Sequence, residues 1–255
     1  MFANNKGRDV VALLIPKNNK EEQRAMKQKQ SAVYGFLILV LTIITTLSCL
    51  RAEGADRAVD IDGHGYNTVS KGGKVWMRDN LNVSRYRNGD EITQAETREE
   101  WLDAAAKGEG AWCYYNNDKA KGKTYGRLYN WFAVNDPRGI APVGWHVPSR
   151  EEWDNLATAL AGVALPGRKK SPALKVWHYP SASVDNAIHF NAVPGGIRET
   201  EDDAFRFIGE EAFFWSASEA TPAFASYAQF NFENSVIKLD LLEKREGISV
   251  RCIKD

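Results

Sequence analysis

The sequence has few cysteines and little proline. Its 255 residues include 3 cysteines, 9 prolines and 20 glycines, and 44% of them are hydrophobic. Three cysteines are too few for a disulfide scaffold, and this composition is too apolar for a disordered chain and too poor in glycine and proline for collagen. A chain of this length and composition can bury a hydrophobic core.

The sequence also has no excess of charge, because 33 Lys and Arg balance 33 Asp and Glu. Residues 1–48 hold seven basic and three acidic residues, which leaves 26 basic and 30 acidic residues from Cys49 onward. Nucleic-acid binding needs clustered basic side chains that neutralise phosphates. The mildly acidic body therefore predicts no nucleic-acid partner.

Only one apolar run is long enough to enter a membrane. Residues 32–47 (AVYGFLILVLTIITTL) follow Lys27 and Lys29 and are followed at once by Ser48 and Cys49. A basic start, an apolar stretch of this length and a small residue at its end are typical of a secretory signal peptide.

The end of this run, Leu47-Ser48-Cys49, resembles a bacterial lipobox, in which a signal peptidase cleaves before a cysteine that becomes acylated. We expect residues 1–48 to be an extension and a lipoprotein signal peptide, with Met26 as the true start, and Cys49 to carry the lipid. The alternative is an uncleaved anchor over residues 32–50. Both interpretations place the body in the cell envelope, and the lipoprotein is expected on the outer membrane, facing the periplasm or the cell surface.

The rest of the chain has the features of one domain. Residues 49–57 are expected to form a tether, and residues 58–255 contain no linker, repeat or block of like charge. Apolar and β-branched residues predict a hairpin over 59–69 and a strand over 74–77. Four more strands are expected near the carboxyl end, at residues 213–217, 226–232, 236–241 and 248–253.

Two helices are predicted from capping signals. Thr97 is followed three residues later by Glu100, and an alanine-rich run ends at Gly108. Ser149 and Glu152 repeat the signal. The apolar face of this second helix is expected to consist of Trp153, Leu156, Ala157 and Leu160.

The remaining segments show no clear periodicity. Residues 125–134 fit either a short helix or a strand, and residues 80–95, 108–125 and 163–210 are expected to be irregular. Two helices among many short strands, joined by long loops, indicate an α+β fold with a mixed, mostly antiparallel sheet rather than a doubly wound one.

Motifs of common enzymes are absent. The sequence contains no Gly-x-Ser-x-Gly, no phosphate-binding loop and no His-Glu-x-x-His. His146 is a candidate base or ligand at neutral pH, but the histidines show no metal-ligand spacing, so a packed, hydrogen-bonded His146 is expected. We therefore expect a protein without enzymatic activity.

One acidic segment is a weak candidate for a metal site. Glu199, Glu201, Asp202 and Asp203 lie close together in a predicted loop, and carboxylates are oxygen ligands that Ca²⁺ prefers. A solvated acidic loop is the competing interpretation. No cofactor is expected, and calcium is the one that the sequence leaves open.

Aromatic residues are abundant, with 8 Trp and 9 Tyr. Those in predicted strands and helices are assigned to the core, namely Trp76, Trp145, Trp153 and Trp215. Those in the segments expected to be irregular are candidates for an exposed platform that stacks on sugar rings or contacts a protein. These ligand-binding candidates are Trp112, Tyr114, Tyr115, Trp177 and Tyr179. Arg198 follows a Pro-Gly-Gly turn, where it either ties loops by hydrogen bonds or contacts the ligand.

Several segments, read in order, resemble one known family. They are DIDG at 60–63, WMRDNL at 76–81, AWCYYNND at 111–118, YGRLYNW at 125–131, PVGWHVPS at 142–149, PGGIR at 194–198, FWS at 214–216 and SVRCIKD at 249–255. Together they are similar to the Fibrobacter succinogenes major paralogous domain. The resemblance implies a bacterial envelope lipoprotein domain whose activity is not established, related to the C-type lectin-like fold with two helices and long loops.

The chain departs from this family at Ala141, where the family usually has a cysteine. A family disulfide from that position to the one matched by Cys252 cannot form here. With Cys49 acylated, Cys113 and Cys252 remain as a candidate pair in an oxidising compartment. The alternative is that both are buried thiols.

Our leading hypothesis from the sequence is a lipid-anchored envelope protein whose module binds a glycan or a protein. A structural or assembly role in the envelope, without a soluble ligand, is the first alternative. A carbohydrate-active or oxidative enzyme is the third candidate.

Overall fold

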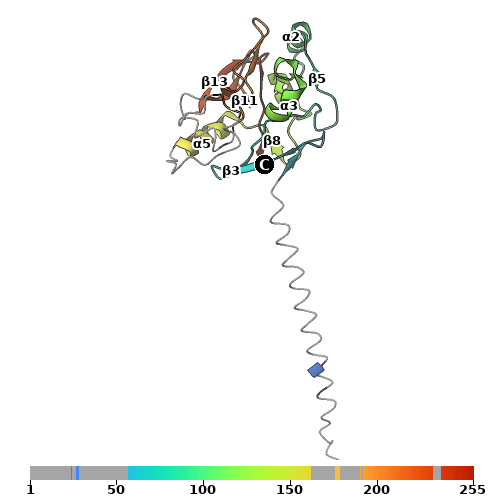
Figure 1. The fold of residues 1–255 in the computed structure, drawn as a ribbon, viewed down its shortest axis with the longest axis vertical. Helices are drawn as coiled ribbons and strands as arrows, with labels where there is room; N and C mark the ends of the chain where they lie inside the picture. The colour runs from blue at the N-terminus through green and yellow to red at the C-terminus, as the bar shows by residue number, and fades with distance from the viewer. Residues whose placement is uncertain are drawn as a thin grey trace, which may run out of the picture. The chain divides into compact units, whose positions relative to one another are not determined.

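The computed structural model describes residues 24, 27–28, 57–161, 176–178, 190, 192–231 and 237–255, which Figure 1 draws in colour. Contacts divide the chain into two units, residues 1–54 and residues 55–255, and the second has its own hydrophobic core. The predicted signal peptide and the lipid site at Cys49 lie outside the described residues. Within the part that is described, no helix has the length and apolar character needed to cross a bilayer.

The second unit is built from short strands and a few helices. The strands are β1 (Ala58–Val59), β2 (Gly65–Tyr66), β3 (Thr68–Lys71), β4 (Lys74–Met77), β5 (Thr93–Gln94), β6 (Ala111–Cys113), β7 (Leu128–Tyr129), β8 (Trp145–His146), β9 (Ile197–Glu199), β10 (Ala204–Arg206), β11 (Glu211–Glu219), β12 (Phe224–Asn231), β13 (Lys238–Glu243), β14 (Gly247–Ile248) and β15 (Ile253–Lys254). The helices are α2 (Arg98–Lys107), α3 (Lys119–Tyr125), α4 (Trp131–Asn135) and α5 (Arg150–Ala161), and a 3-10 helix covers Tyr115–Asn117.

These strands pair in four sheets. A six-stranded sheet has the order β10-β9-β14-β7-β6-β5, a four-stranded sheet has the order β3-β4-β15-β8, a three-stranded sheet has the order β11-β12-β13, and β1 pairs with β2. Among these strand pairs only β5 and β6 run parallel. The chain is therefore an α+β protein with mostly antiparallel sheets, as the sequence predicts.

The predicted hairpin near residue 60 is confirmed, although its strands are short. β1 and β2 pair around a tight turn in which the Gly63 amide donates to the Asp60 carbonyl oxygen at 3.0 Å. Gly63 adopts a φ of 86°, which glycine tolerates best. The strand predicted at 74–77 is β4, which pairs with β3.

The helix predicted to begin at Thr97 is α2. The Thr97 hydroxyl accepts from the Glu100 amide, and the Glu100 carboxylate accepts from the Thr97 amide. Gly108 ends the helix with a φ of 69°. This reciprocal capping satisfies amides that the first turn of a helix leaves unpaired.

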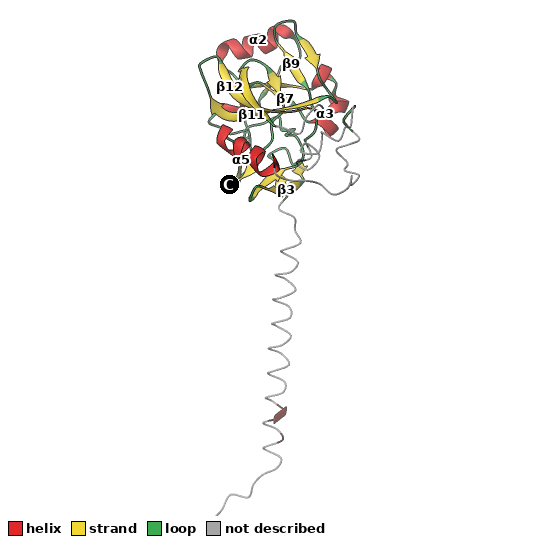
Figure 2. Ribbon diagram, turned by 90° about the vertical axis from the view of Figure 1, so that its left-hand side faces the viewer, coloured by secondary structure: helices red, strands yellow, loops and turns green. Residues whose placement is uncertain are grey.

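The second predicted helix is α5, and it covers the three-stranded sheet (Figure 2). Trp153, Leu156 and Leu160 are buried, as expected for one apolar stripe. The Trp153 ring stacks on the ring of Phe214, with centroids 5.7 Å apart. Because α5 crosses only part of the sheet, the strands β12 and β13 continue beyond its first turn.

The carboxyl-terminal strands are confirmed in part. The strands predicted at 213–217, 226–232 and 236–241 correspond to β11, β12 and β13. The single strand predicted at 248–253 is wrong, because the chain divides there into β14 and β15, which belong to different sheets. The sequence does not reveal this division, because residues 248–253 are all buried and apolar residues continue from β14 to β15.

The prediction of only two helices is wrong, and so is the irregular segment predicted at 108–125, whereas residues 80–92 hold no helix or strand, as predicted. Residues 108–125 hold β6 and α3, and residues 125–134 contain both β7 and most of α4. Asp118 caps α3, and the Asn130 side chain accepts from the Ala133 amide at the start of α4. Helices this short depend on caps and tertiary contacts, so periodicity cannot reveal them.

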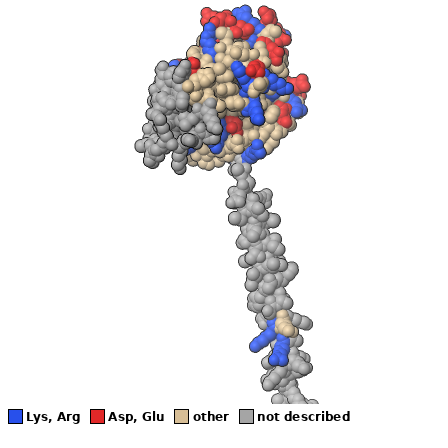
Figure 3. All heavy atoms as spheres, in the orientation of Figure 1, with Lys and Arg blue, Asp and Glu red and all other residues tan. Residues whose placement is uncertain are grey.

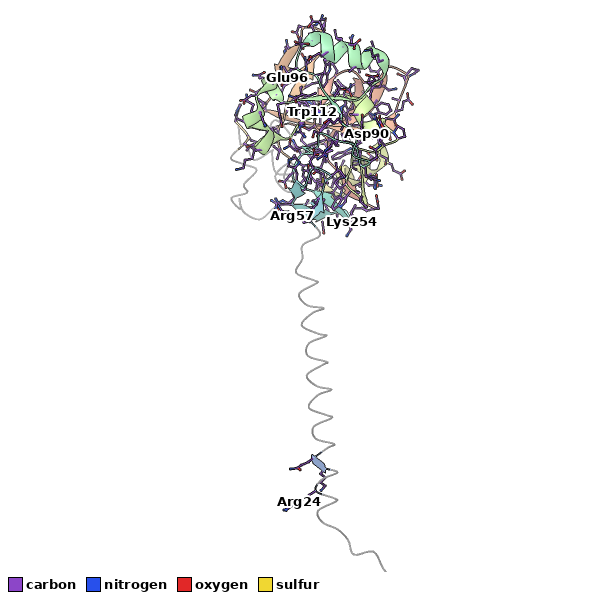
Figure 4. The ribbon with its side chains drawn as sticks, turned by 90° about the vertical axis from the view of Figure 1, so that its right-hand side faces the viewer. Arg24, Arg57, Asp90, Glu96, Trp112 and Lys254 are labelled. Carbon is purple, nitrogen blue, oxygen red and sulfur yellow. The ribbon has the colours of Figure 1, made fainter. Side chains whose placement is uncertain are left out.

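The start and the end of the domain lie together. Figure 4 shows Arg57 and Lys254 at one end of the domain, and Figures 1 and 2 show α2 at the opposite end from β3. The pairing of β15 with both β4 and β8 holds the carboxyl terminus at the first of these ends.

Candidate functional site

The predicted aromatic platform does not lie on the surface. The Trp112 indole N–H donates to the Ile92 carbonyl oxygen at 2.9 Å, and the ring is buried within the six-stranded sheet. The Arg127 guanidinium lies 3.9 Å from the centroid of Trp112 and donates to the Tyr114 hydroxyl at 3.1 Å. The prediction of an exposed platform is therefore wrong for Trp112 and Tyr114, because Arg127 and the neighbouring strands cover both rings.

Tyr115 and Trp177 are buried as well. The Tyr115 ring lies 5.4 Å from the ring of Phe205, and the Trp177 indole donates to the Ala192 carbonyl oxygen at 3.1 Å. Both rings belong to hydrophobic clusters, so the prediction of exposure is wrong for them too. Tyr179, the remaining aromatic candidate, lies outside the described residues.

Arg198 is fully buried and ties loops together. Its Nη1 donates to the Ala95 carbonyl oxygen at 2.8 Å, and its Nη2 donates to the Glu96 carbonyl oxygen at 3.3 Å. Its Nε and Nη2 also reach one carboxylate oxygen of Asp203, at 3.1 and 2.8 Å. The proposed ligand contact is therefore wrong, since the guanidinium is occupied and inaccessible, and the loop-tying alternative is confirmed.

The acidic candidates lie in and around the turn between β9 and β10, and their partners are arginines. Glu199 and Asp202 both accept from Arg206, while Asp203 accepts from Arg198. Glu201 is exposed at the tip of the turn. Within the described ranges, no group of three or more His, Cys, Asp or Glu side chains is placed to hold a metal.

The candidate disulfide is absent, because Cys113 and Cys252 are separate buried thiols. Cys113 packs with Trp101 and Leu128, whereas Cys252 belongs to a different hydrophobic cluster. Burial raises the pKa of the Cys113 thiol to about 12 and raises that of Cys252 further above its usual range. Both thiols are therefore neutral and unreactive in the folded protein.

His146 is hydrogen-bonded, as the sequence predicts, and its partners are two carboxylates, but its side chain is 39% exposed rather than packed. Its Nδ1 lies 2.6 Å from Asp255 Oδ1, and its Nε2 lies 3.0 Å from Glu152 Oε1. Partial burial works to raise the pKa of the Glu152 carboxyl, but the Ser149 amide and His146 outweigh it and hold the pKa below its usual value. His146 thus connects the end of the chain to the first turn of α5.

An open hollow lies where α5 begins. It is an open groove of about 910 Å³ between the first turns of α5 and the part of the three-stranded sheet that the helix leaves uncovered. We call it the α5 groove and define it by Arg150 and Asp154 of α5, Ser218 and Glu219 of β11, Ser226 of β12 and Leu241 of β13.

Arg150 holds the walls of the α5 groove together. Its backbone amide donates to the Ser218 hydroxyl at 2.9 Å, and its Nη1 donates to the Ser226 hydroxyl at 3.4 Å. The hydrogen bond from Lys238, with the Leu241 amide and the positive charges of Lys238 and Arg150, lowers the pKa of Asp240 at the groove edge. Asp240 is therefore a carboxylate at neutral pH.

Apolar side chains border these polar groups. Leu241 is 45% exposed and is the cross-strand partner of Ser226, and Phe224, which lies two residues before Ser226 on the same face of β12, is 37% exposed. Side chains of this size are usually covered in a sheet that packs against a helix. The α5 groove thus combines hydroxyl, guanidinium and carboxylate groups with the aliphatic surface of Leu241, and the Phe224 ring lies next to the groove on the same face of β12.

Sequence reasoning missed these residues. Arg150, Ser218 and Leu241 come from three elements, and about 70 residues separate the first from the second. The local signal was the alternation of apolar and polar residues in β12 and β13. This alternation shows which side chains share a face of the sheet, but it does not show how much of that face a helix covers. The groove is a product of the tertiary arrangement.

The fold and the groove define a mixed α+β domain with an open, polar and partly apolar surface hollow. The family model described as the Fibrobacter succinogenes major domain matches residues 69–254. The chain belongs to this family. No curated protein and no solved structure matches it.

Proposed function

We propose that the chain is a lipid-anchored bacterial envelope protein whose domain binds a ligand in the α5 groove. The lipobox-like segment ending at Cys49 and the family membership support the envelope location, on the outer membrane and facing the periplasm or the cell surface. The single observation that carries the binding role is the groove itself, where Leu241 remains exposed beside Arg150 and Ser226, with the exposed Phe224 next to the groove on the same face of β12.

The chemistry of the groove favours a glycan over a protein as the ligand. A sugar ring presents hydroxyls on its edge and C–H groups on its face, so it pairs with mixed polar and aromatic surfaces. Arg150 and Asp240 supply a donor and an acceptor, and Phe224, exposed next to the groove on β12, supplies a ring face.

We propose a binding role rather than catalysis, without a cofactor. Each serine hydroxyl at the start of α5 already accepts from a protein N–H: Ser149 from Glu152, Ser218 from Arg150, and Ser226 from Arg150. Such hydroxyls position backbone and are not paired with a general base. This arrangement supports the non-enzymatic proposal.

We further propose that the domain is related to the C-type lectin-like fold. The mostly antiparallel sheets, the helices α2 and α5 and the closeness of Arg57 to Lys254 are compatible with that relationship (Figure 4). Many proteins with that fold bind ligands, so the relationship agrees with a binding role, although a fold by itself does not define a function.

A glycan panel screened with residues 55–255 tests the binding role, once in calcium and once in chelator. We expect binding that Arg150→Ala and Phe224→Ala each weaken by about tenfold, because each removes one charged hydrogen bond or one aromatic face. The matched controls Arg138→Ala and Phe207→Ala lie outside the groove and are expected to bind normally.

Three results would redirect the proposal. No hits from a folded sample would favour the structural or assembly role, which stoichiometric co-purification of an envelope partner would then support. Loss of binding in chelator would show that binding needs a metal ion. Unchanged binding in both groove variants would place the ligand elsewhere on the domain.

A further inference from the structure

Two tight turns carry an aliphatic residue at their tips. In the turn Asp60–Gly63 the residue at the second position is Ile61, which is 47% exposed. In the turn Pro142–Trp145, closed by a hydrogen bond of 3.1 Å, the residue at the second position is Val143, which is 80% exposed. Turn tips usually carry polar residues or proline, since they bury little surface. Neither side chain is explained by packing of the domain.

These tips form one surface together with Val59, which is 54% exposed. Val59, Ile61 and Val143 all line a single cleft of about 180 Å³. The three residues come from segments some 80 positions apart in the chain, so their meeting is a property of the fold. We call this surface the turn-tip patch. Contiguous exposed apolar surface of this kind marks a contact with a partner or a membrane.

The carboxylates on either side of Ile61 are paired within the domain. The Asp60 carboxylate accepts from the Tyr66 hydroxyl and from the His64 amide, the latter at 2.9 Å. The Asp62 carboxylate accepts from Ser84 and pairs with Arg85 at 2.6 Å. The tip therefore exposes the aliphatic side chain of Ile61, while the neighbouring carboxylates are paired with groups of the domain.

Basic residues surround the same end of the domain. Arg57 lies two residues before Val59, and Lys254 lies at this end as well (Figure 4). Lys71 and Lys74 flank the turn of the β3–β4 hairpin, whose sheet also contains β15 and β8. Figure 3 shows basic side chains along this lower edge and most visible carboxylates toward the α2 end. Asp255 places one carboxylate at this end, since its amide donates to the Gly144 carbonyl oxygen beside Val143 at 3.1 Å, and its side chain pairs with His146. An apolar tip at an end of the domain that also carries Arg57, Lys71, Lys74 and Lys254 suits an interface with anionic lipid headgroups.

The length of chain before the patch agrees with this partner. Seven residues lie between Cys49 and Arg57, which makes eight residue steps, and an extended chain spans at most about 3.6 Å per step. A lipid at Cys49 therefore leaves at most roughly 29 Å of chain before the domain begins. Of the two ends of the domain, the one with the turn-tip patch is the one that the tether joins.

We infer that the turn-tip patch rests on the bilayer to which the chain is anchored, and that this contact orients the domain with α2 pointing away from the membrane. The inference rests on the proposed lipid anchor and goes beyond it. An acyl anchor alone lets a domain rotate freely on its tether, whereas a second, interfacial contact fixes one face outward. The contact is expected to depend on anionic lipid and to weaken in high salt.

The test uses the full, acylated chain in vesicles of phosphatidylethanolamine and phosphatidylglycerol that contain a lipid-phase quencher. A fluorophore is placed at Ile61→Cys or Val143→Cys, and at Asp103→Cys on α2 as the matched control. Cys113 and Cys252 are buried and do not compete for the label. We expect the quencher to remove the fluorescence at positions 61 and 143 and to leave position 103 unchanged.

The outcomes separate this inference from the anchor. Protein that floats with the vesicles but shows equal quenching at positions 61 and 103 would overturn the inference and keep the anchor. Protein that does not float would overturn the anchor and the inference with it. Self-quenching at position 143 in detergent, rising with protein concentration, would assign the patch to a second copy instead. The double variant Val59→Asp/Val143→Asp is expected to abolish the quenching at position 61 without unfolding the domain, because both side chains are exposed.

Discussion

Two arginines in the β9–β10 hairpin show that the contribution of a residue to stability depends on its burial. Arg198 is fully buried and satisfies two carbonyl oxygens and Asp203, whereas the Arg206 side chain is 38% exposed and pairs with Glu199 and Asp202. Water competes with an exposed ion pair, but a buried group that loses its partner stays unpaired. Arg198 is therefore the residue on which the hairpin depends.

Replacing Arg198 tests this difference. Arg198→Met leaves Asp203 and two carbonyl oxygens without their donor, so we expect the free energy of unfolding to fall by about 3 kcal/mol. The matched control Arg206→Met is expected to cost less than about 1 kcal/mol. Urea denaturation of residues 55–255 measures both values. Equal losses in the two variants would contradict the assignment.

At the scale of elements, the helices α2 and α5 begin with the same reciprocal cap. Thr97 and Glu100 form it in α2, and Ser149 and Glu152 form it in α5. Glu152 has a second role, since it also accepts from His146 and so connects α5 to the end of the chain. Only the cap of α2 can therefore be tested by itself.

Removal of the α2 cap gives the element-scale prediction. Thr97→Ala leaves the Glu100 amide without its acceptor, and we expect a loss of about 1 kcal/mol in the free energy of unfolding. Thr97→Ser keeps the hydroxyl and is expected to restore nearly all of it. Thermal and urea denaturation measure the loss. A Thr97→Ser variant as unstable as Thr97→Ala would show that the methyl group, not the cap, is responsible.

At the scale of the whole molecule, stability is expected to depend on pH through several carboxylates. The pKa of Asp62 lies below its usual value. Partial burial acts to raise this pKa, but hydrogen bonds from Ser84 and Arg85 outweigh that effect. The pKa of Glu152 also lies below its usual value, because the effect of partial burial, which raises the pKa, is outweighed by hydrogen bonds from the Ser149 amide and His146. A lowered folded-state pKa adds stability that is present above the unfolded pKa and is lost as pH falls through the folded value.

The acid dependence follows directly. We expect the free energy of unfolding of residues 55–255 to fall between about pH 5 and pH 2. Glu152→Gln removes one of the contributing carboxyls. We expect this variant to have a lower free energy of unfolding at neutral pH and to lose less of it as the pH falls. The control Glu151→Gln makes the same charge change one residue away and is expected to keep the wild-type slope. An unchanged slope in Glu152→Gln would show that this carboxyl does not contribute.

Signals confined to a few neighbouring residues predicted structure well. The caps at Thr97 and Ser149 mark the starts of α2 and α5, and the alternation of β12 and β13 marks a sheet, because each pattern reports on bonds formed within one segment. Burial of a loop-like aromatic is different. Trp112 and Tyr114 looked exposed because neither lies in a periodic segment, and only the distant Arg127 and the neighbouring strands show that they are covered.

The sequence by itself determined the family, the α+β class and the two long helices. Each of these depends on short motifs or on the balance of residue types. Tertiary structure alone decided that residues 248–253 divide between two sheets, that Cys113 and Cys252 stay apart, and that the α5 groove and the turn-tip patch exist. These features join segments dozens of residues apart, and pairing at that distance depends on which faces are already buried, which no local pattern records.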